Sequence, residues 1–225
     1  MGKDNQAKHR QQARNLKRRS AQRAPFERVL IVCEGEKTEP HYINEIRCAL
    51  RLATANVQVG PSALGTQPLQ VVEYAETLFR KGDHPKVIKP RAFDRVIAVF
   101  DRDDHDGYHQ ALDKAEALNG KLKNDADERV PFQAIASVPC FELWLLLHFE
   151  DIHAPIHRNE VYERLKVHLP GYNKGQGGHW LKTKDHLEVA IKRAQTRAAA
   201  TNAHSGHEPY TAMHNLVLQL IHLKD

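Results

Sequence analysis

The chain has 225 residues, of which 41% are hydrophobic, and a formal net charge of +5. This length can bury one sizeable core with a smaller appended part. Its longest apolar runs, at 29–33 and 143–147, are far shorter than the roughly 18 residues that indicate a membrane helix, and no apolar segment follows the basic N-terminus as in a signal peptide. We therefore expect a cytoplasmic protein with no membrane partner. The three cysteines lack CxxC spacing, which predicts neither a disulfide framework nor a structural zinc site.

The positive charge is concentrated in the first 23 residues, which contain eight Lys and Arg residues and one Asp. The remaining residues carry 25 basic and 27 acidic side chains. With almost no large apolar residues, positions 1–25 are predicted to form a disordered basic arm. Such an arm can bind DNA or RNA by releasing counterions from phosphates, although a solubilising tail has the same composition. The candidate nucleic-acid contacts are Lys8, Arg10, Arg14, Lys17, Arg18, Arg19 and Arg23.

Beyond the arm, apolar runs alternate with helical patterns, which predicts a mostly parallel α/β sheet flanked by helices over residues 26–150. The expected strands cover 28–33, 57–59, 93–100 and 132–138. The first expected helix begins near Thr38, which can cap it. Two further helices are expected at 68–80 and 106–118. Residues 151–225 contain helical patterns at 159–169, 184–200 and 210–222, which predict an appended helical part packed on the core.

Acidic residues follow two of the predicted strands. Glu34 comes directly after the first, and Asp101 and Asp103 follow the strand at 93–100. Parallel strands present their carboxyl ends at one crevice, so these carboxylates should converge there. We expect Asp101 and Asp103 to share one side of an extended segment. Converging oxygen ligands suit magnesium or manganese, and Glu39 is a further candidate ligand. The alternatives are polar strand ends, a turn cap and, for Glu39, a helix N-terminal acid.

Two further segments carry candidate site residues. Glu142 and His148 lie in an apolar stretch; Glu142 is either a functional carboxylate or part of a structural salt bridge, and His148 is expected in the core or on the surface. The glycine-rich segment 171–178 reads as a flexible connection. It could also cradle a phosphate with the help of Lys174 and Lys182.

The motifs resemble a known family. Glu34-Gly35 and Asp101-x-Asp103, each after a strand, resemble the Toprim signature of topoisomerases, primases and OLD-type nucleases. The longer strings CEGEKTEP at 33–40, FDRDDH at 100–105 and SVPCFELWLLLHF at 137–149 resemble the RloB-like family of prokaryotic defence proteins, as does EPYT at 208–211. The one departure is Val138, where a small polar residue is usual. The resemblance implies a Toprim-like fold, a divalent metal and a nuclease role in abortive infection beside an AAA-type or ABC-type ATPase.

Together these observations favour a metal-dependent nuclease that hydrolyses phosphodiesters of DNA or RNA. Its catalytic residues would be Glu34, Asp101, Asp103 and Glu142, with Glu34, Glu39, Asp101 and Asp103 as metal ligands. Two other functions remain open: a non-catalytic adaptor that binds nucleic acid or a partner protein, and phosphoryl transfer on small molecules.

Overall fold

The computed structural model describes residues 27–54, 56–103, 105–205 and 209–224. Its central element is a five-stranded sheet with the order β2-β1-β3-β6-β7. The strands are β1 (Val29–Cys33), β2 (Val57–Pro61), β3 (Arg95–Asp101), β6 (Phe132–Val138) and β7 (Tyr210–Thr211). The first four are parallel, and β7 pairs antiparallel with β6. The predicted mostly parallel sheet flanked by helices is therefore confirmed. A separate antiparallel pair joins β4 (Leu122–Lys123) to β5 (Arg129–Val130).

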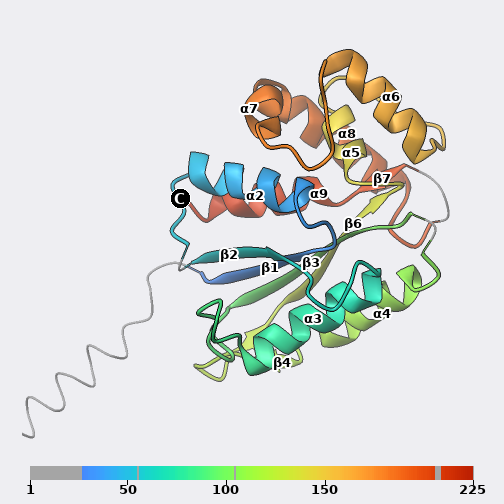
Figure 1. The fold of residues 1–225 in the computed structure, drawn as a ribbon. Helices are drawn as coiled ribbons and strands as arrows, with labels where there is room; N and C mark the ends of the chain where they lie inside the picture. The colour runs from blue at the N-terminus through green and yellow to red at the C-terminus, as the bar shows by residue number, and fades with distance from the viewer. Residues whose placement is uncertain (1–26, 55, 104, 206–208, 225) are drawn as a thin grey trace, which may run out of the picture.

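Helices cover both faces of the sheet (Figure 1). On one face lie α3 (Pro68–Lys81) and α4 (Tyr108–Leu118), which pack against alternate residues of the central strands, such as Leu30 and Val96. On the other face lies α2 (Thr38–Ala49), which packs against the intervening residues, such as Ile31 and Ile97. Both sides of each central strand are thus buried, which explains why the strands read as continuous apolar runs.

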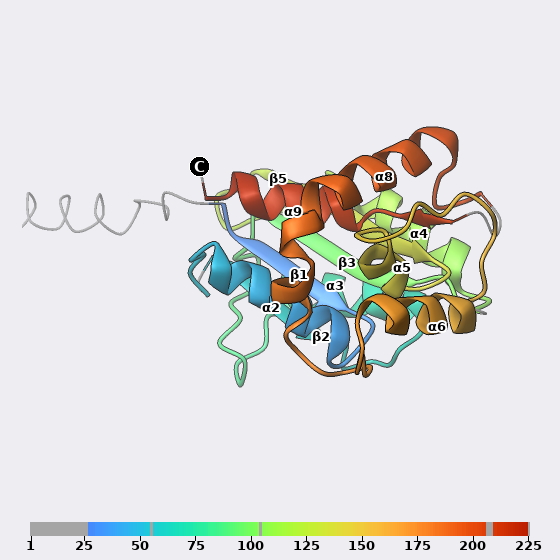
Figure 2. The ribbon, with the colours of Figure 1, turned by 90° about the horizontal axis from the view of Figure 1, so that it is seen from above.

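The segment after β6 builds a helical group over the carboxyl ends of the strands (Figures 1 and 2). It consists of α5 (Glu142–Leu146), α6 (Arg158–His168), α7 (His179–Thr183), the 3₁₀ turn η1 (Lys184–His186) and α8 (Leu187–Ala200). The chain then returns to the sheet as β7 and continues into α9 (Met213–His222), which packs beside α2 and β6. These helices share one buried apolar core with α2 and one face of the sheet.

Two local expectations are wrong. Thr38 does not cap α2, because its hydroxyl accepts a hydrogen bond from the backbone N–H of Gly175 (2.9 Å) instead. The predicted helix at 210–222 starts three residues late, because Tyr210 and Thr211 pair with Val138 and Ser137 as strand β7. Among the described residues, none of the helices is both long and apolar enough to span a membrane. The predicted basic arm lies outside the described residues.

Candidate metal centre

The ends of β1 and β3 bring Glu34 and Asp101 together. The backbone N–H of Glu34 donates to the carbonyl of Val99 (2.8 Å), and the Glu34 carboxylate accepts from the backbone N–H of Asp101 (2.8 Å). Glu34 therefore ties the two strand ends together through main chain and side chain. Asp101 is the last residue of β3 and only 5% exposed.

Asp103 lies beyond a turn in the backbone. Its φ angle is +37°, a left-handed conformation that Asp tolerates better than most residues. The segment is therefore not extended, and the expected period-two arrangement of Asp101 and Asp103 is wrong. One oxygen of Asp103 pairs with the Arg158 guanidinium on α6 at 2.7 Å. Nearby, Nε2 of His105 lies 3.4 Å from the Glu34 carboxylate.

Glu39 reaches the same place from the first turn of α2. It is 4% exposed, and its carboxylate lies against the Gly35 backbone. A Cβ atom on Gly35 would lie 2.1 Å from Oε2 of Glu39, so any larger residue at position 35 would displace this carboxylate. The glycine after Glu34 therefore leaves room for the Glu39 carboxylate in the position that it occupies.

Glu142 begins α5 and is 1% exposed. One of its oxygens accepts a hydrogen bond from the Tyr172 hydroxyl (2.7 Å). No salt bridge of Glu142 occurs among the described residues, so its structural alternative as half of an ion pair is not supported. It belongs with the other buried and half-buried carboxylates to a group that we call the acidic cluster: Glu34, Glu39, Asp101, Asp103 and Glu142.

Burial and mutual repulsion make ionisation of this cluster unfavourable. Burial raises the pKa of Glu34 to about 7, and the charges of Glu39 and Asp103 add to this effect. Burial also raises the pKa of Asp101 well above its usual range, and repulsion from Glu39 and Glu34 raises it further. The pKa of Glu39 is raised in the same way. Burial raises the pKa of Asp103 as well, although Arg158 opposes the shift.

Two carboxylates of the acidic cluster and one histidine form a group that could hold a metal ion. Ligand atoms of Glu34, Asp103 and His105 all lie within 4.8 Å of one another. Of the four predicted ligands, Glu34 and Asp103 belong to this group, whereas Asp101 and Glu39 lie beside it and act on it electrostatically. His105, the last residue of the string FDRDDH, is the third member.

The acidic cluster also contains unsatisfied oxygen atoms. Within the described part of the chain, one carboxylate oxygen each of Glu39, Asp103 and Glu142 is buried without a hydrogen-bond partner. Buried carboxylate oxygens are normally satisfied by donors or by cations. Their number at one place fits a site for a hard divalent cation.

The two candidate lysines differ in position. Lys174, in the loop between α6 and α7, acts electrostatically on Glu142, Glu34 and Asp103. Lys182 is exposed on α7 and, among the described residues, forms no hydrogen bond or ion pair with the acidic cluster. The seven predicted contacts of the basic arm lie outside the described residues.

Sequence reasoning missed the partners of the carboxylates. Arg158, Tyr162 and Tyr172 lie on or after α6, far from the acidic motifs in sequence, and no motif marks them. By contrast, His148 is a core residue, as expected: it is 2% exposed, and burial lowers its pKa to about 4.

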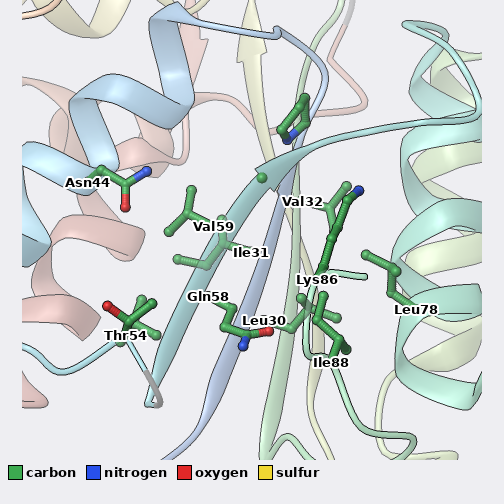
Figure 3. A pocket seen from close by; sticks show the side chains of 13 residues that line it. Leu30, Ile31, Val32, Asn44, Thr54, Gln58, Val59, Leu78, Lys86 and Ile88 are labelled. Atoms are coloured by element: carbon green, nitrogen blue, oxygen red, sulfur yellow. The ribbon is translucent and has the colours of Figure 1, made fainter. Parts of the chain in front are cut away.

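A hollow of about 230 Å³ lies at the edge strand β2 (Figure 3). It is lined by apolar residues such as Leu30, Val59 and Leu78. Of the described residues that line it, Lys86 alone is ionisable, and its ammonium donates to the Tyr74 hydroxyl (2.7 Å). No residue of the acidic cluster lines it. The hollow therefore lacks the chemistry found at the strand ends.

Comparison with known proteins agrees with the motifs. A model of the RloB-like protein family matches residues 29–220, which include the whole acidic cluster and the loop that carries Lys174. No curated protein and no solved structure matches the chain. Because the match covers most of the chain, from the first strand to the last helix, the chain belongs to the RloB-like protein family.

Proposed function

We propose that the chain is a metal-dependent nuclease that hydrolyses phosphodiesters of DNA or RNA. The observation that carries this proposal is the convergence of Glu34, Asp103 and His105, with ligand atoms within 4.8 Å of one another, beside further buried carboxylates. Perturbed carboxylates that gather at the ends of parallel strands are typical of functional sites.

The residues fit magnesium or manganese. The group of Glu34, Asp103 and His105 would hold the ion, and Glu39 and Asp101, which interact electrostatically with Glu34, are further candidate ligands. The unpartnered oxygens of Glu39 and Asp103 support this assignment, because each is a buried carboxylate oxygen that accepts no hydrogen bond from any described residue. A bound divalent ion would neutralise charge on the phosphate and lower the pKa of a bound water.

The chain's own residues supply the remaining functions. Glu34, whose pKa is about 7 in the absence of metal, is suited either to accept a proton near neutral pH or to bind the ion, and both roles remain open. The hydroxyl of Tyr172 orients Glu142 inside the cluster. Glu142 would act as a positioning carboxylate.

We further propose that the basic arm contacts the nucleic-acid backbone through Lys8, Arg10, Arg14, Lys17, Arg18, Arg19 and Arg23. Its dense positive charge supports this role. Deletion of residues 1–23 should weaken binding and flatten its salt dependence, since each lost contact removes roughly 0.9 from the logarithmic slope on duplex DNA. Unchanged affinity and slope in a filter-binding titration would identify the arm as a passive tail.

The biological setting is proposed from the family alone. Membership of the RloB-like family supports an effector role in anti-phage defence by abortive infection, with an AAA-type or ABC-type ATPase as partner. A cytoplasmic nuclease without control would damage its own cell. We therefore expect the isolated chain to have low activity that the partner raises.

The test is cleavage of labelled DNA and RNA pools with magnesium, manganese or a chelator, with and without the partner. We expect Asp101→Asn and Asp103→Asn to abolish metal-dependent cleavage while the fold persists, because the amide keeps the shape but loses the charge. Asp113→Asn is the matched control, since the Asp113 side chain is 73% exposed on α4. Equal cleavage by the wild type and both cluster variants, with the partner supplied, would favour the adaptor instead.

A further inference from the structure

Tyr162 on α6 holds two cationic side chains at once. Its hydroxyl accepts hydrogen bonds from Nη2 of Arg158 (3.3 Å) and from Nζ of Lys174 (3.2 Å). Its ring also lies 5.9 Å from the Arg158 guanidinium and 5.7 Å from the Lys174 ammonium, both within cation–π range. We call Arg158, Tyr162 and Lys174 the Tyr162 bracket.

The bracket faces the acidic cluster. Nη1 of Arg158 lies 2.7 Å from Asp103, one of the three grouped metal-ligand candidates. Desolvation alone would lower the pKa of Lys174, but the negative charge of Glu142 raises it overall, so the ammonium is charged beside the carboxylates. Two cations therefore border the place where a metal ion would bind.

The loop that carries Lys174 is fastened to α2 and is not a free connection. The backbone N–H of Gly175 donates to the Thr38 hydroxyl (2.9 Å). Beyond it, the backbone N–H groups of Gly178 and Trp180 both donate to the Glu45 carboxylate. Gly175 has a φ angle of +84°, which glycine adopts without strain. These bonds fix the position of Lys174 before any ligand arrives, which reduces the ordering cost of binding.

Neither cation is fully used by the protein. Within the described residues the exposed Lys174 ammonium donates one hydrogen bond, to Tyr162, although it carries three donors. Arg158 uses Nη1 for Asp103 and Nη2 for Tyr162, and it lines a small cavity of about 60 Å³ together with Asp103 and His157. Donors that remain available beside a metal site are suited to a phosphate group.

We propose that the Tyr162 bracket binds a backbone phosphate of the nucleic-acid strand, with Arg158 and Lys174 as the contacting residues and Tyr162 as their positioning residue. The proposal rests on the proposed function for the identity of the substrate. The competing explanation is that both cations only neutralise the acidic cluster.

The experiment measures binding of a fluorescein-labelled single-stranded 12-mer to the full chain by anisotropy. Calcium replaces magnesium, because its larger size and looser coordination suit binding without turnover. The variants are Arg158→Gln/Lys174→Gln and Tyr162→Phe. The matched control is Lys166→Gln, which removes one charge from an exposed α6 residue paired with Glu163 at 2.8 Å. Circular dichroism and thermal melts establish that each variant is folded.

Loss of two charge-assisted contacts should weaken binding by about tenfold or more and lower the logarithmic salt slope by about 1.4 on a single strand. Tyr162→Phe should weaken binding at an unchanged slope, because both charges remain but lose their shared acceptor. Binding by the double variant equal to that of Lys166→Gln would overturn the proposal. If the chain binds through the bracket but never cleaves, the proposed function fails and this inference stands.

Discussion

The pKa values of carboxylates are shifted in opposite directions at the two ends of the central strands. At the amino ends, Arg28 donates to Asp94 (3.0 Å) and to Asp125 (2.7 Å), and Arg95 pairs with Glu27 (2.9 Å). Burial opposes ionisation of Asp94, but the hydrogen bonds from Arg28 lower its pKa overall. At the carboxyl ends, the pKa values of Glu34, Asp101 and Asp103 are all raised.

The comparison separates structural charge from functional charge within one sheet. Pairing at the amino ends fastens β1 and β3 to the loop that contains Asn124, whose side chain also donates to Asp94 (2.8 Å). Crowding at the carboxyl ends stabilises nothing by itself, so the fold carries it as a cost. Perturbed carboxylates of this kind are typical of functional sites, and Glu34, Asp103 and His105 form a group that could hold a metal ion. Four measurements would break or sharpen this contrast.

Removal of the Arg28 guanidinium at the amino ends of the strands should have the largest effect on stability. Arg28→Met leaves the partly buried Asp94 without its guanidinium, and we expect unfolding to become easier by about 3 kcal/mol. Arg80→Met is the control, because Arg80 forms an exposed pair with Glu76 on α3 that is worth about 0.5 kcal/mol or less. Equal losses in urea denaturation would show that the Arg28 network is no more structural than a surface pair.

Addition of a divalent ion should stabilise the carboxyl ends. At magnesium or manganese concentrations 100 times Kd, mass action predicts a gain of about 2.7 kcal/mol in the free energy of unfolding. Asp103→Asn should lose most of this gain, whereas Asp94→Asn should keep it despite its lower starting stability. A gain that persists in Asp103→Asn, measured by calorimetry, would place the ion elsewhere.

The affinity for metal should depend on pH. Because the pKa of Glu34 is about 7 without metal, binding below that pH must displace a proton. Affinity should therefore rise with pH, by about fivefold between pH 6 and 7 and by about twofold between pH 7 and 8, and level off above that. Calorimetric titrations in buffers of different ionisation enthalpy would detect the released proton. An affinity that stays constant from pH 6 to 8 would contradict a role for Glu34 as ligand.

The smallest effect concerns Asp101 in the absence of metal. Its raised pKa means that the unfolded chain ionises this group at lower pH than the folded chain, so stability is lost as pH rises above the unfolded pKa. At pH 8 with a chelator, Asp101→Asn should therefore stabilise the protein by about 1 kcal/mol. Asp94→Asn should have the opposite sign, because its folded pKa is lowered. If thermal melts show that both variants are less stable than the wild type, the predicted difference between the two ends of the strands is wrong.

Much of the fold follows from local pattern. The central strands are apolar on both sides because helices cover both faces of the sheet, so runs such as 93–100 and 132–138 are visible in the sequence. Strand β7 is different: it has two residues, too short for any periodicity, and it exists because Tyr210 and Thr211 find partners on β6. Tertiary pairing overrides the helical pattern at this point.

The carboxylates of the site are predictable, whereas their partners are not. Glu34 and Asp101 come at strand ends, a position that sequence reveals through topology. The turn at Asp103 depends on a positive φ angle, and the N–H of this residue donates to the Pro139 carbonyl (3.1 Å), a contact that no local pattern encodes. Arg158 and Tyr172 meet the acidic cluster only after α6 folds back over the sheet.

The return of the chain to β7 has a consequence for biosynthesis. Ser137 stands between Asp101 on β3 and Thr211 on β7, and its hydroxyl lies 3.0 Å from that of Thr211. On the ribosome, the strands that carry Glu34 and Asp101 emerge long before the residues that complete the sheet beside them. A nascent chain therefore holds Glu34 and Asp101 without their final scaffold until the residues of β7 have also emerged. If the chain cuts nucleic acid, this order of assembly delays activity until β7 can pair with β6.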